Sequence, residues 1–323
     1  MRFVKFNHVM LVSMLMLLQA CASVDHPGYF QRYEQAFKEK TGYKTHFVER
    51  DGLKIHVREF GRKTTKPTWV LMHGFPDSIH LYDRLVPELL DNQHVITFDF
   101  IGWGDSDKPA NHRYDFASLR ADLEAVVEQL DLKRVVLVVH DASGPVGIDW
   151  SFDNQDKTAG LVLLNTFYSP MPTLKAPEEI AVFSTPGIKR WVSVLATRLS
   201  DSLLINRYNA QIARFISSES LREPFQKVLG HQFLKIRPAF YGLNRALRAE
   251  LERNAARTAR LASFRPPVRI IFGEDDPYLN VGVARDFDKL YGDADLFLIK
   301  GAGHFVQVDK PERVAKLIKA LAR

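Results

Sequence analysis

Short apolar runs alternate along the chain with longer stretches in which apolar residues recur every three or four positions. The runs are rich in β-branched and aliphatic residues, which is typical of strands buried on both faces; they are 68–72, 94–100, 135–139, 160–165, 268–272 and 294–299. Stretches 80–90, 115–130 and 311–321 are typical of helices. Strands that alternate with helices predict an α/β fold, with a mostly parallel central sheet, helices on both faces and right-handed crossovers.

Two stretches depart from this alternation. Residues 45–50 and 53–60 are typical of two strands, and the Asp51-Gly52 pair between them is a strong hairpin signal. Residues 166–266 contain no convincing strand and have helical patterns at 188–199, 203–216, 221–229 and 246–264. Their apolar positions are too numerous to be left in water, so we predict an all-helical segment inserted into the α/β core.

The N-terminal residues differ from the rest of the chain. Arg2 and Lys5 precede an apolar run, 9–18, that is too short to span a bilayer comfortably. The run ends in Leu18-Gln19-Ala20-Cys21, and Cys21 is the only cysteine. This ending resembles the lipobox of bacterial lipoproteins, although the glutamine is a less usual residue in it. An uncleaved amphipathic anchor and an ordinary signal peptide are the alternatives.

The lipobox implies that Cys21 becomes the lipidated first residue of the mature protein. Ala22 stands where an aspartate would imply retention at the inner membrane. We therefore expect a lipid-anchored protein of the bacterial cell envelope, held at the outer membrane and facing the periplasm. The predicted organisation is a signal peptide (1–20), a tether with a short helix (21–44), a first part of the core (45–165), a helical cap (166–266) and a second part of the core (267–323).

Composition and charge limit the function classes. Hydrophobic residues make up 46% of the 323-residue chain and charged residues 25%, which is ordinary for a globular protein and argues against disorder. The formal net charge is +6, of which Arg2 and Lys5 would be lost with the signal, and the other basic residues are mixed with acidic ones. We therefore expect no nucleic-acid partner. A single cysteine provides no disulfide framework, so stability must come from packing.

Three polar residues follow the carboxyl ends of predicted strands: Asp141, Asp276 and His304. In an open α/β sheet, ligands and catalytic groups gather at this edge. The strand 135–139 changes abruptly into a helical pattern at Gly144, so Asp141 lies on a sharp strand-to-helix turn. The chain order of nucleophile, acid and histidine is that of the elbow triad of the α/β-hydrolases, with Asp141 in the place of the usual serine.

Five motifs carry a resemblance to the epoxide hydrolase and haloalkane dehalogenase branch of the α/β-hydrolases, over residues 45–323. In chain order they are His73-Gly74-Phe75-Pro76, 99–109, Val139-His140-Asp141, 273–277 and 301–305. The resemblance implies an α/β-hydrolase fold with an inserted helical cap. It implies Asp141 as the nucleophile, and His304 with Asp276 as the base and its acidic partner. The backbone N–H groups of Phe75 and Ala142 would form an oxyanion hole.

Two rivals compete for these roles. Ser143 is the other candidate nucleophile, but the elbow needs small residues two positions to either side, and Ser143 has an aspartate and a proline there. Asp275 competes with Asp276 as the partner of the histidine; the resembled pattern has the acid directly before a proline, which selects Asp276. An Asp141 that only caps the next helix and a structural His304 are the alternatives without chemistry.

An aspartate nucleophile limits the reaction. Attack by a carboxylate on an ester carbonyl gives an anhydride, whereas in-line attack on a saturated carbon gives a stable alkyl ester on Asp141. His304, oriented by Asp276, can then take a proton from the water that attacks this ester. We therefore predict a small hydrophobic substrate with an electrophilic sp3 carbon, in an epoxide or a carbon–halogen bond, and neither a metal nor a cofactor. We expect His73 to shape its loop rather than to react.

The leaving group separates two candidate reactions. The resembled dehalogenases bind halide with a tryptophan directly after the nucleophile, and epoxide hydrolases commonly have the same residue there. This chain has Ala142 at that position, and the side chain of Phe75 offers no hydrogen-bond donor for a halide either. Epoxide hydrolases protonate the ring oxygen with tyrosines of the cap, for which Tyr241 and Tyr208 are candidates, with Tyr168 also available. We predict epoxide-hydrolase-type ring opening. Haloalkane dehalogenation and an inactive hydrolase fold retained as a binding lipoprotein are the alternatives.

Overall fold

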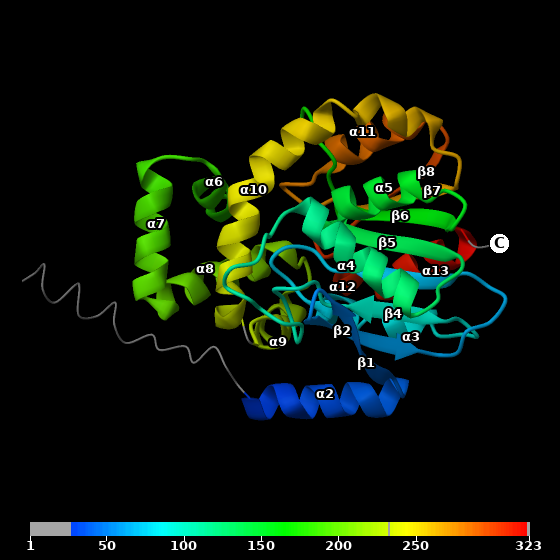
Figure 1. Ribbon diagram of the computed structural model, residues 1–323, viewed down its shortest axis with the longest axis horizontal. Coiled ribbons are helices and arrows are strands. Elements are labelled where there is room, and N and C mark those ends of the chain that lie inside the picture. Colours follow the sequence, from blue (N-terminus) through cyan, green and yellow to red (C-terminus); the bar gives the residue numbers. More distant parts are fainter. Residues whose placement is uncertain (1–26, 232, 322–323) are drawn as a thin grey trace, which may run out of the picture.

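A computed structural model describes residues 27–231 and 233–321 (Figure 1). Eight strands form one sheet in the spatial order β1-β2-β4-β3-β5-β6-β7-β8. Their bounds are β1 (Lys44–Arg50), β2 (Leu53–Phe60), β3 (Thr68–Met72), β4 (Val95–Phe98), β5 (Val135–Asp141), β6 (Thr158–Thr166), β7 (Val268–Gly273) and β8 (Ala294–Ile299). β2 pairs antiparallel with β1 and β4, and all other neighbours are parallel. The predicted mostly parallel sheet is confirmed.

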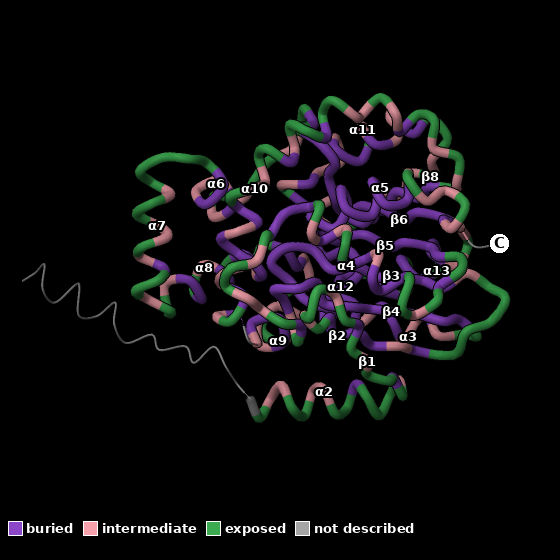
Figure 2. The backbone as a smooth tube through the Cα atoms, viewed as in Figure 1, coloured by how far each residue is buried: buried purple, intermediate pink, exposed green. Residues whose placement is uncertain are grey.

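The centre of the sheet is covered on both faces. Every residue of β3, β4 and β7 is buried, as is every residue of β5 except Asp141 (Figure 2). α4 (Phe116–Gln129) and α5 (Ser143–Asp153) pack together on one face, and α3 (Val86–Leu89) packs with α13 (Pro311–Leu321) on the other. A strand in this position needs apolar side chains in both directions, which explains the continuous apolar runs of the sequence.

Prolines move two helix boundaries away from those predicted from periodicity. Residues 80–90 form a 3-10 helix, η1 (Ile79–Tyr82), and then a separate helix α3 with Pro87 in its first turn. α10 (Arg237–Ala255) likewise has a proline in its first turn, and it starts well before the predicted start at residue 246. A proline has no N–H to donate to the preceding turn, so it ends one helix and fits the first turn of the next.

Between β6 and β7 the described residues form helices and no strand. Besides α10 these helices are α6 (Glu178–Ser184), α7 (Ile188–Leu199), α8 (Asp201–Phe215), α9 (Glu219–Leu229), η2 (Phe233–Ile236) and η3 (Thr258–Ser263). In Figure 1 most of this insertion lies to the left of the sheet, and α7 is its outermost helix. The core then continues with α11 (Val281–Tyr291) and α12 (Val306–Asp309) around the last strands.

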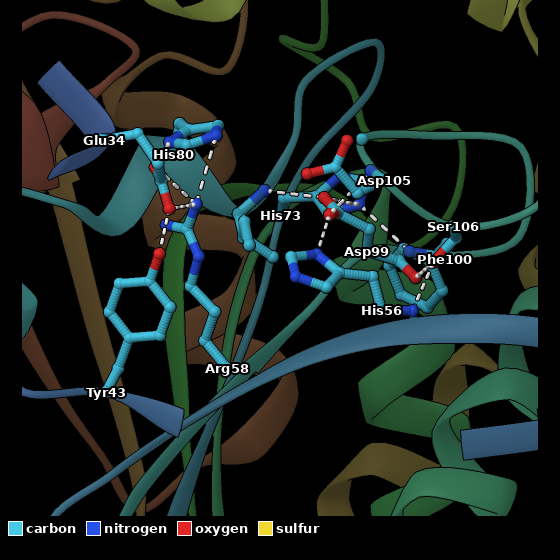
Figure 3. A network of polar contacts seen from close by, with 12 residues as sticks. Glu34, Tyr43, His56, Arg58, His73, His80, Asp99, Phe100, Asp105 and Ser106 are labelled. Atoms are coloured by element: carbon cyan, nitrogen blue, oxygen red, sulfur yellow. Dashed lines mark hydrogen bonds and ion pairs between the residues drawn. The ribbon is translucent and has the colours of Figure 1, made fainter. Parts of the chain in front are cut away.

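Helix α2 (Pro27–Thr41) precedes the sheet and is tied to it by a buried arginine (Figure 3). The guanidinium group of Arg58, on β2, donates to both carboxylate oxygens of Glu34, on α2, at 2.7 Å. The ring of Phe30 stacks on that of His231, which follows α9, with 3.7 Å between the centroids. α2 therefore contacts both the core and the insertion.

The described part of the chain contains no helix that is both long and apolar enough to cross a bilayer. The predicted signal peptide and Cys21 lie outside the described residues. Cleavage and lipidation at Cys21 therefore stay predictions.

Candidate active site

Asp141 is the last residue of β5 and lies on the sharp turn into α5. Its φ of +49° lies in the left-handed region, where a residue with a side chain is strained, and such strain gathers at functional sites. The first turn of α5 packs closely on the sheet, because a Cβ on Gly144 would lie 1.7 Å from Oγ1 of Thr166. This glycine lets the helix begin beside Asp141, whose side chain lines a cavity at the edge of the sheet.

The two carboxylate oxygens of Asp141 have different surroundings. Oδ1 accepts a hydrogen bond from the backbone N–H of Phe75 at 2.9 Å, and Oδ2 lies 3.7 Å from Nε2 of His304. Burial raises the pKa of Asp141, while the charge of His304 and the backbone N–H groups of Phe75 and Ala142 act in the opposite direction. The structure therefore brings the two residues predicted for the oxyanion hole to Asp141.

His304 lies between Asp141 and Asp276. Its Nδ1 is 2.7 Å from Oδ2 of Asp276; because a carboxylate only accepts, Nδ1 carries the proton and Nε2 faces Asp141. Oδ1 of Asp276 accepts from the backbone N–H groups of Tyr278 and Leu279, at 2.9 and 3.1 Å. Three residues far apart in the sequence thus form one row, Asp141, His304 and Asp276.

The charges of this row act on one another. Burial lowers the pKa of His304, but the carboxylates of Asp276 and Asp141 outweigh burial and hold the pKa above its ordinary value. Burial raises the pKa of Asp276, but His304 and the donors Tyr278 N–H and Asn165 outweigh burial and hold the pKa below its usual range. Asp276 is therefore ionised at neutral pH, and its charge stabilises a protonated His304.

Neither rival residue takes part in this row. Oγ of Ser143 accepts from the backbone N–H of His140 at 2.9 Å and contacts the carbonyl oxygens of His140 and Met72 at 2.8 Å. Ser143 is therefore held inside the protein by backbone groups. The carboxylate of Asp275 accepts from Ser217 at 3.2 Å on the surface, away from His304.

His73 and Asp99 hold the loops next to Asp141 (Figure 3). Nε2 of His73 accepts from the backbone N–H of Phe100 at 3.2 Å, so Nδ1 carries the proton and donates to the carbonyl oxygen of Gly74 at 2.7 Å. Burial lowers the pKa of His73 against the opposing charge of Asp99, which keeps the ring neutral. Asp99 in turn lies 2.9 Å from Nδ1 of His56. The carbonyl group of Gly74 and the N–H group of Phe75 belong to one peptide group. By holding this carbonyl, His73 orients the N–H group that contacts Asp141.

Sequence reasoning missed a second carboxyl group near Asp141. Asp77 is 3% exposed, and neither of its carboxyl oxygens has a hydrogen-bond partner among the described residues, which is an exception for a buried polar group. Burial, together with the charge of Asp141, raises the pKa of Asp77 to about 8, against the opposing charge of His304. Asp77 therefore keeps its proton at neutral pH. It directly follows the motif 73–76, but nothing in the sequence shows that its carboxyl group lacks partners.

Asn165 was missed as well, although the sequence carries a signal for it. Its Nδ2 donates to Oδ2 of Asp276 at 3.0 Å, and its Oδ1 accepts from the backbone N–H of Gly273 at 2.8 Å. Asn165 thereby connects β6 to β7 and orients the acid of the row. A polar residue near the end of a buried apolar strand is the same signal that identified Asp141.

A cavity of about 80 Å³ lies in front of Asp141 and His304. Its walls are mostly apolar and include side chains from the core loops and from α6, α8 and α10, namely Phe75, Phe167, Ile180, Phe215, Leu243, Leu247 and Leu251. Gln211 and Tyr278 add polar groups. Such a lining binds apolar groups and orients them with few polar contacts. Among the described residues no group of three or more His, Cys, Asp or Glu side chains could hold a metal ion.

The tyrosines predicted as acids of the cap do not line this cavity. The hydroxyl of Tyr241 pairs with Oγ1 of Thr197 at 2.8 Å, and that of Tyr208 donates to a backbone carbonyl at the end of α9 at 3.2 Å. Neither hydroxyl has a hydrogen bond to Asp141 among the described residues, although burial and the charge of the neighbouring Asp77 raise the pKa of Tyr208. The tyrosine found among the described lining residues is Tyr278, from the loop after β7.

Comparison with known proteins gives a family and several relatives. The family model of the alpha/beta hydrolase fold matches residues 67–311. A haloalkane dehalogenase of Psychrobacter cryohalolentis is 30% identical over 285 residues, which cover 82% of this chain and 86% of that protein. A cis-3-alkyl-4-alkyloxetan-2-one decarboxylase of Shewanella oneidensis is 30% identical over 197 residues, which cover 59% of this chain and 57% of the length of that protein.

Solved structures are similar over most of the chain, at lower identity. A membrane phospholipase A, described as a novel bacterial virulence factor, has a TM-score of 0.75 and 18% identity and covers 98% of both chains. The epoxide hydrolase CorEH has a TM-score of 0.70 and 21% identity, over 86% of this chain and 99% of that one. At these identities the similarity shows the fold alone, which hosts hydrolases of different substrates.

Proposed function

The chain belongs to the alpha/beta hydrolase family, and from this premise we propose that it hydrolyses an electrophilic sp3 carbon through an alkyl ester on Asp141. One observation carries the proposal. A carboxylate stands at the strained turn between β5 and α5, with its Oδ2 3.7 Å from Nε2 of His304. The neighbouring hydroxyl, that of Ser143, is engaged with backbone groups instead.

In the first step, a carboxylate oxygen of Asp141 forms a bond to the substrate carbon while the bond from that carbon to the leaving atom breaks. A saturated carbon suits this nucleophile because the product is an alkyl ester, which is stable until water is activated. The apolar walls hold the substrate against Asp141, and holding two reactants in line removes much of the entropic part of the barrier.

In the second step, Nε2 of His304 takes a proton from water, and the water oxygen attacks the carboxyl carbon of Asp141. The oxyanion that forms accepts hydrogen bonds from the backbone N–H groups of Phe75 and Ala142, the groups that already face this carboxyl. The bond from the carboxyl carbon to the substrate oxygen then breaks, and that oxygen takes the proton from His304. Asp276 stabilises the protonated histidine between these events.

We favour an epoxide as the substrate because of the groups available for the leaving atom. The alkoxide formed from an epoxide needs a proton donor, whereas a halide needs N–H donors, and neither Ala142 nor Phe75 has a side chain that supplies one. Tyr278 lines the cavity with Asp141 and carries a hydroxyl that can give a proton. The amide of Gln211 and the ammonium group of Lys175 also line the cavity, and their N–H groups do not favour one leaving atom over the other. Tyr278, which also interacts with Arg214, is therefore our candidate for the role that the sequence assigned to cap tyrosines.

Dehalogenation is the second candidate, and one observation favours it beside the dehalogenase relatives. The indole N–H of Trp103 is buried and has no acceptor among the described residues. Trp103 borders a cavity of about 10 Å³ that Phe75 and Ala142 also line. An unpaired N–H group beside a cavity that the two oxyanion-hole residues also line is the kind of donor that a halide requires.

The choice of substrate is tested with the purified full chain. We expect diol release from styrene-type epoxides and no halide release from 1-halobutanes. Halide release would favour dehalogenation instead. Turnover of neither class, with no covalent adduct on Asp141 by mass spectrometry, would contradict both reactions and indicate a binding protein.

The intermediate is tested with His304→Gln. This variant should form the ester but hydrolyse it slowly, so that an adduct accumulates on Asp141 and turnover falls about 10³-fold. Ser143→Ala combined with His304→Gln is the matched control, because it also removes the rival hydroxyl, and the adduct should still accumulate on Asp141. An adduct on Ser143 in the natural chain, or undiminished turnover of His304→Gln, would contradict the mechanism.

We also propose that a lipid on Cys21 holds the protein at the outer membrane. The lipobox-like sequence 18–21 supports this location. Cys21→Ala should move the protein from the membrane fraction to the soluble periplasmic fraction. Absence of acyl chains on Cys21 in the natural chain, measured by mass spectrometry of the N-terminal peptide, would refute lipidation.

A further inference from the structure

Exposed apolar side chains gather on one helix of the insertion. Among the described residues six large hydrophobic side chains are exposed, and five of them lie on α7: Ile188 (73%), Trp191 (63%), Val192 (49%), Leu195 (42%) and Leu199 (79%). Their spacing of three or four residues places them on one side of the helix, here called the α7 stripe. In Figure 2 most of α7 is exposed or intermediate. A contiguous exposed stripe of this kind marks an interaction surface.

A cavity of about 310 Å³ next to the α7 stripe is lined by arginines. Arg190 and Arg198 reach it from α7, and Arg245 reaches it from α10. Trp191 belongs to both the stripe and the lining of the cavity. A neighbouring cavity of about 260 Å³ shares Arg198 and Arg245 with the first, so the positive lining extends over both.

The three guanidinium groups have no carboxylate partner in the part of the chain that the structure describes. Within residues 27–231 and 233–321, no carboxylate forms an ion pair with Arg190, Arg198 or Arg245, and Arg198 lies over the ring of Tyr241 at 5.6 Å. Three other arginines of the insertion, Arg214, Arg237 and Arg253, lie within 2.6 Å of a carboxylate oxygen. Arg190, Arg198 and Arg245 differ from the remaining unpaired arginines of the insertion in that they line one cavity together. Guanidinium groups bind phosphate oxygens through paired N–H donors, so this unpaired cluster fits a phosphorylated ligand.

We propose that the α7 stripe and the arginine-lined cavity form a docking surface for anionic phospholipids of a membrane. The apolar stripe enters the region of the acyl chains, and the lipid phosphates bind Arg190, Arg198 and Arg245. Trp191 lies between the α7 stripe and the arginine-lined cavity. In membrane proteins tryptophan is enriched at the corresponding level, the interface between the acyl chains and water. A helix with one apolar and one basic side lies in the plane of the membrane surface and does not span it.

The position of α7 in the molecule fits this occupant. α7 is the outermost helix of the insertion, and in this view the first residues of α2, which follow the predicted lipid anchor, lie nearer to α7 than the last residues of α2 do (Figure 1). α10 carries Arg245 toward this surface and the leucines Leu243, Leu247 and Leu251 toward the cavity of Asp141. The docking surface does not depend on the reaction proposed for Asp141.

Trp191 reports on this surface without any label. The other three tryptophans, Trp69, Trp103 and Trp150, are buried, so changes in polarity at the membrane act on Trp191. The full chain is reconstituted into phosphatidylcholine vesicles with and without phosphatidylglycerol, with brominated acyl chains as quenchers. We expect a blue shift and quenching in the anionic vesicles, and Trp191→Phe should lose both. An anchor on Cys21 would hold the chain equally on both vesicles, so the difference reports docking of α7.

Variants separate the charge from the apolar stripe. Arg190→Gln, Arg198→Gln and Arg245→Gln together should weaken docking on the order of a hundredfold, about fivefold for each positive charge removed near an anionic surface. The matched control removes the same charge from exposed positions of the core and should dock like the natural chain; it consists of Arg134→Gln, Arg285→Gln and Arg313→Gln. Because the altered side chains lie at the surface, thermal unfolding should change little in either triple variant.

Four results would overturn the proposal. Equal quenching in both vesicles would show that the arginines select no lipid, and no quenching on vesicle-bound protein would leave the anchor as the sole contact. A blue shift that grows with protein concentration in the absence of lipid, with a doubled mass in light scattering, would assign the α7 stripe to a second copy of the chain. Calorimetric binding of glycerol phosphate without docking would assign the arginine-lined cavity to a soluble anion.

Discussion

At the scale of single residues, three carboxyl groups lie near His304, those of Asp276, Asp141 and Asp77, and they differ in their hydrogen-bond partners. Asp276 accepts several hydrogen bonds, and these with His304 hold its pKa below the usual range in spite of burial. Asp77 is buried without a partner, and its pKa is raised to about 8. Above that pH, Asp77 becomes a second negative charge near Asp141. The protonation of this one residue therefore couples the stability of the protein to pH between 3.8 and about 8.

As pH rises from about 4 to about 8, Asp77→Asn should lose less stability than the natural chain. A carboxyl group whose pKa is raised on folding binds more protons in the folded state, so its contribution to stability is lost as pH rises from the ordinary value of 3.8 to about 8. The loss reaches up to about 1.4 kcal/mol per pH unit, and the asparagine variant avoids it. Urea unfolding over a pH series measures the difference, which should grow up to pH 8 and then level off.

Asp275→Asn is the control for this experiment, because it removes an exposed carboxylate of the same region. Its stability should follow that of the natural chain at every pH. Equal pH profiles for Asp77→Asn and the natural chain would show that Asp77 finds a partner in solution.

Asp276→Asn should reduce kcat about 10⁴-fold, because an amide neither holds His304 in its Nδ1–H tautomer nor stabilises the protonated ring. The carboxylates raise the pKa of His304, so the loss of one lowers it, and the acidic limb of the kcat profile, which includes ester hydrolysis, should move to lower pH. The adjacent Asp275→Asn should change neither quantity. An acidic limb at an unchanged pH in Asp276→Asn would exclude His304 as the base.

The residue scale also shows what periodicity and motifs can and cannot predict. Asp141, His304 and Asp276 were predicted because each follows a strand, and the structure brings them into one row. Tyr208 and Tyr241 were chosen by their place along the insertion, but which way a helix turns each side chain depends on packing partners that a sequence does not name. Asp77 was missed because an absent partner leaves no pattern in the sequence.

At the scale of elements, the site depends on how closely α5 lies on the sheet. A Cβ on Gly147 would lie 2.4 Å from Cγ1 of Val139 and 2.7 Å from Cε of Met72, so Gly147→Ala must push the helix outward. We expect a loss of about 1 to 3 kcal/mol in the free energy of unfolding and a lower kcat, because α5 begins at the turn that holds Asp141. Urea unfolding and steady-state kinetics measure the two effects.

The control is Gly28→Ala on α2, where the nearest atom to the added Cβ, in Arg32, is 3.5 Å away. Alanine favours a helix over glycine, so this variant should be neutral or more stable by up to about 1 kcal/mol. A Gly147→Ala protein as stable as Gly28→Ala would show that α5 can shift without cost.

Elements differ in how far the sequence can predict them. The central strands were predicted because a strand covered on both faces requires an unbroken apolar run. Residues 188–199 were also predicted as a helix, and α7 has these bounds. Its apolar periodicity was the reason, yet that periodicity does not tell whether the apolar side meets the protein or faces outward. Only the packing around α7 shows that its apolar side faces outward.

At the scale of the whole molecule, Arg58 ties α2 to the sheet. The carboxylates of Asp83 and Glu34 outweigh the effect of burial and raise the pKa of Arg58, which is therefore always charged. Arg58→Met would leave Asp83 buried without this partner and should cost about 3 kcal/mol in the free energy of unfolding. Lys44→Met, at an exposed position of β1, should stay within about 0.5 kcal/mol of the natural chain. Equal effects of the two substitutions would mean that α2 is held by its apolar contacts alone.

The overall fold could be predicted because five motifs keep a fixed order along the chain, and the matched family model confirms the α/β-hydrolase fold. The choice between an epoxide and a halide could not be predicted in the same way. The cavity before Asp141 is walled by the insertion as well as by the core, and small changes in how those helices pack decide which donor reaches the leaving atom.

The unequal surroundings of the two Asp141 oxygens have an isotopic consequence. Oδ1 is held by the N–H of Phe75 at 2.9 Å, which opposes rotation of the carboxylate. By the proposed route, each turnover passes the attacking oxygen to the product and replaces it with an oxygen from the solvent. Repeated turnover in ¹⁸O-labelled water should therefore label one oxygen of Asp141, and the product of the first turnover should carry ordinary oxygen at the attacked carbon. If the carboxylate rotates between turnovers, both of its oxygens become labelled, and the mass of the peptide that contains Asp141 shows a second ¹⁸O.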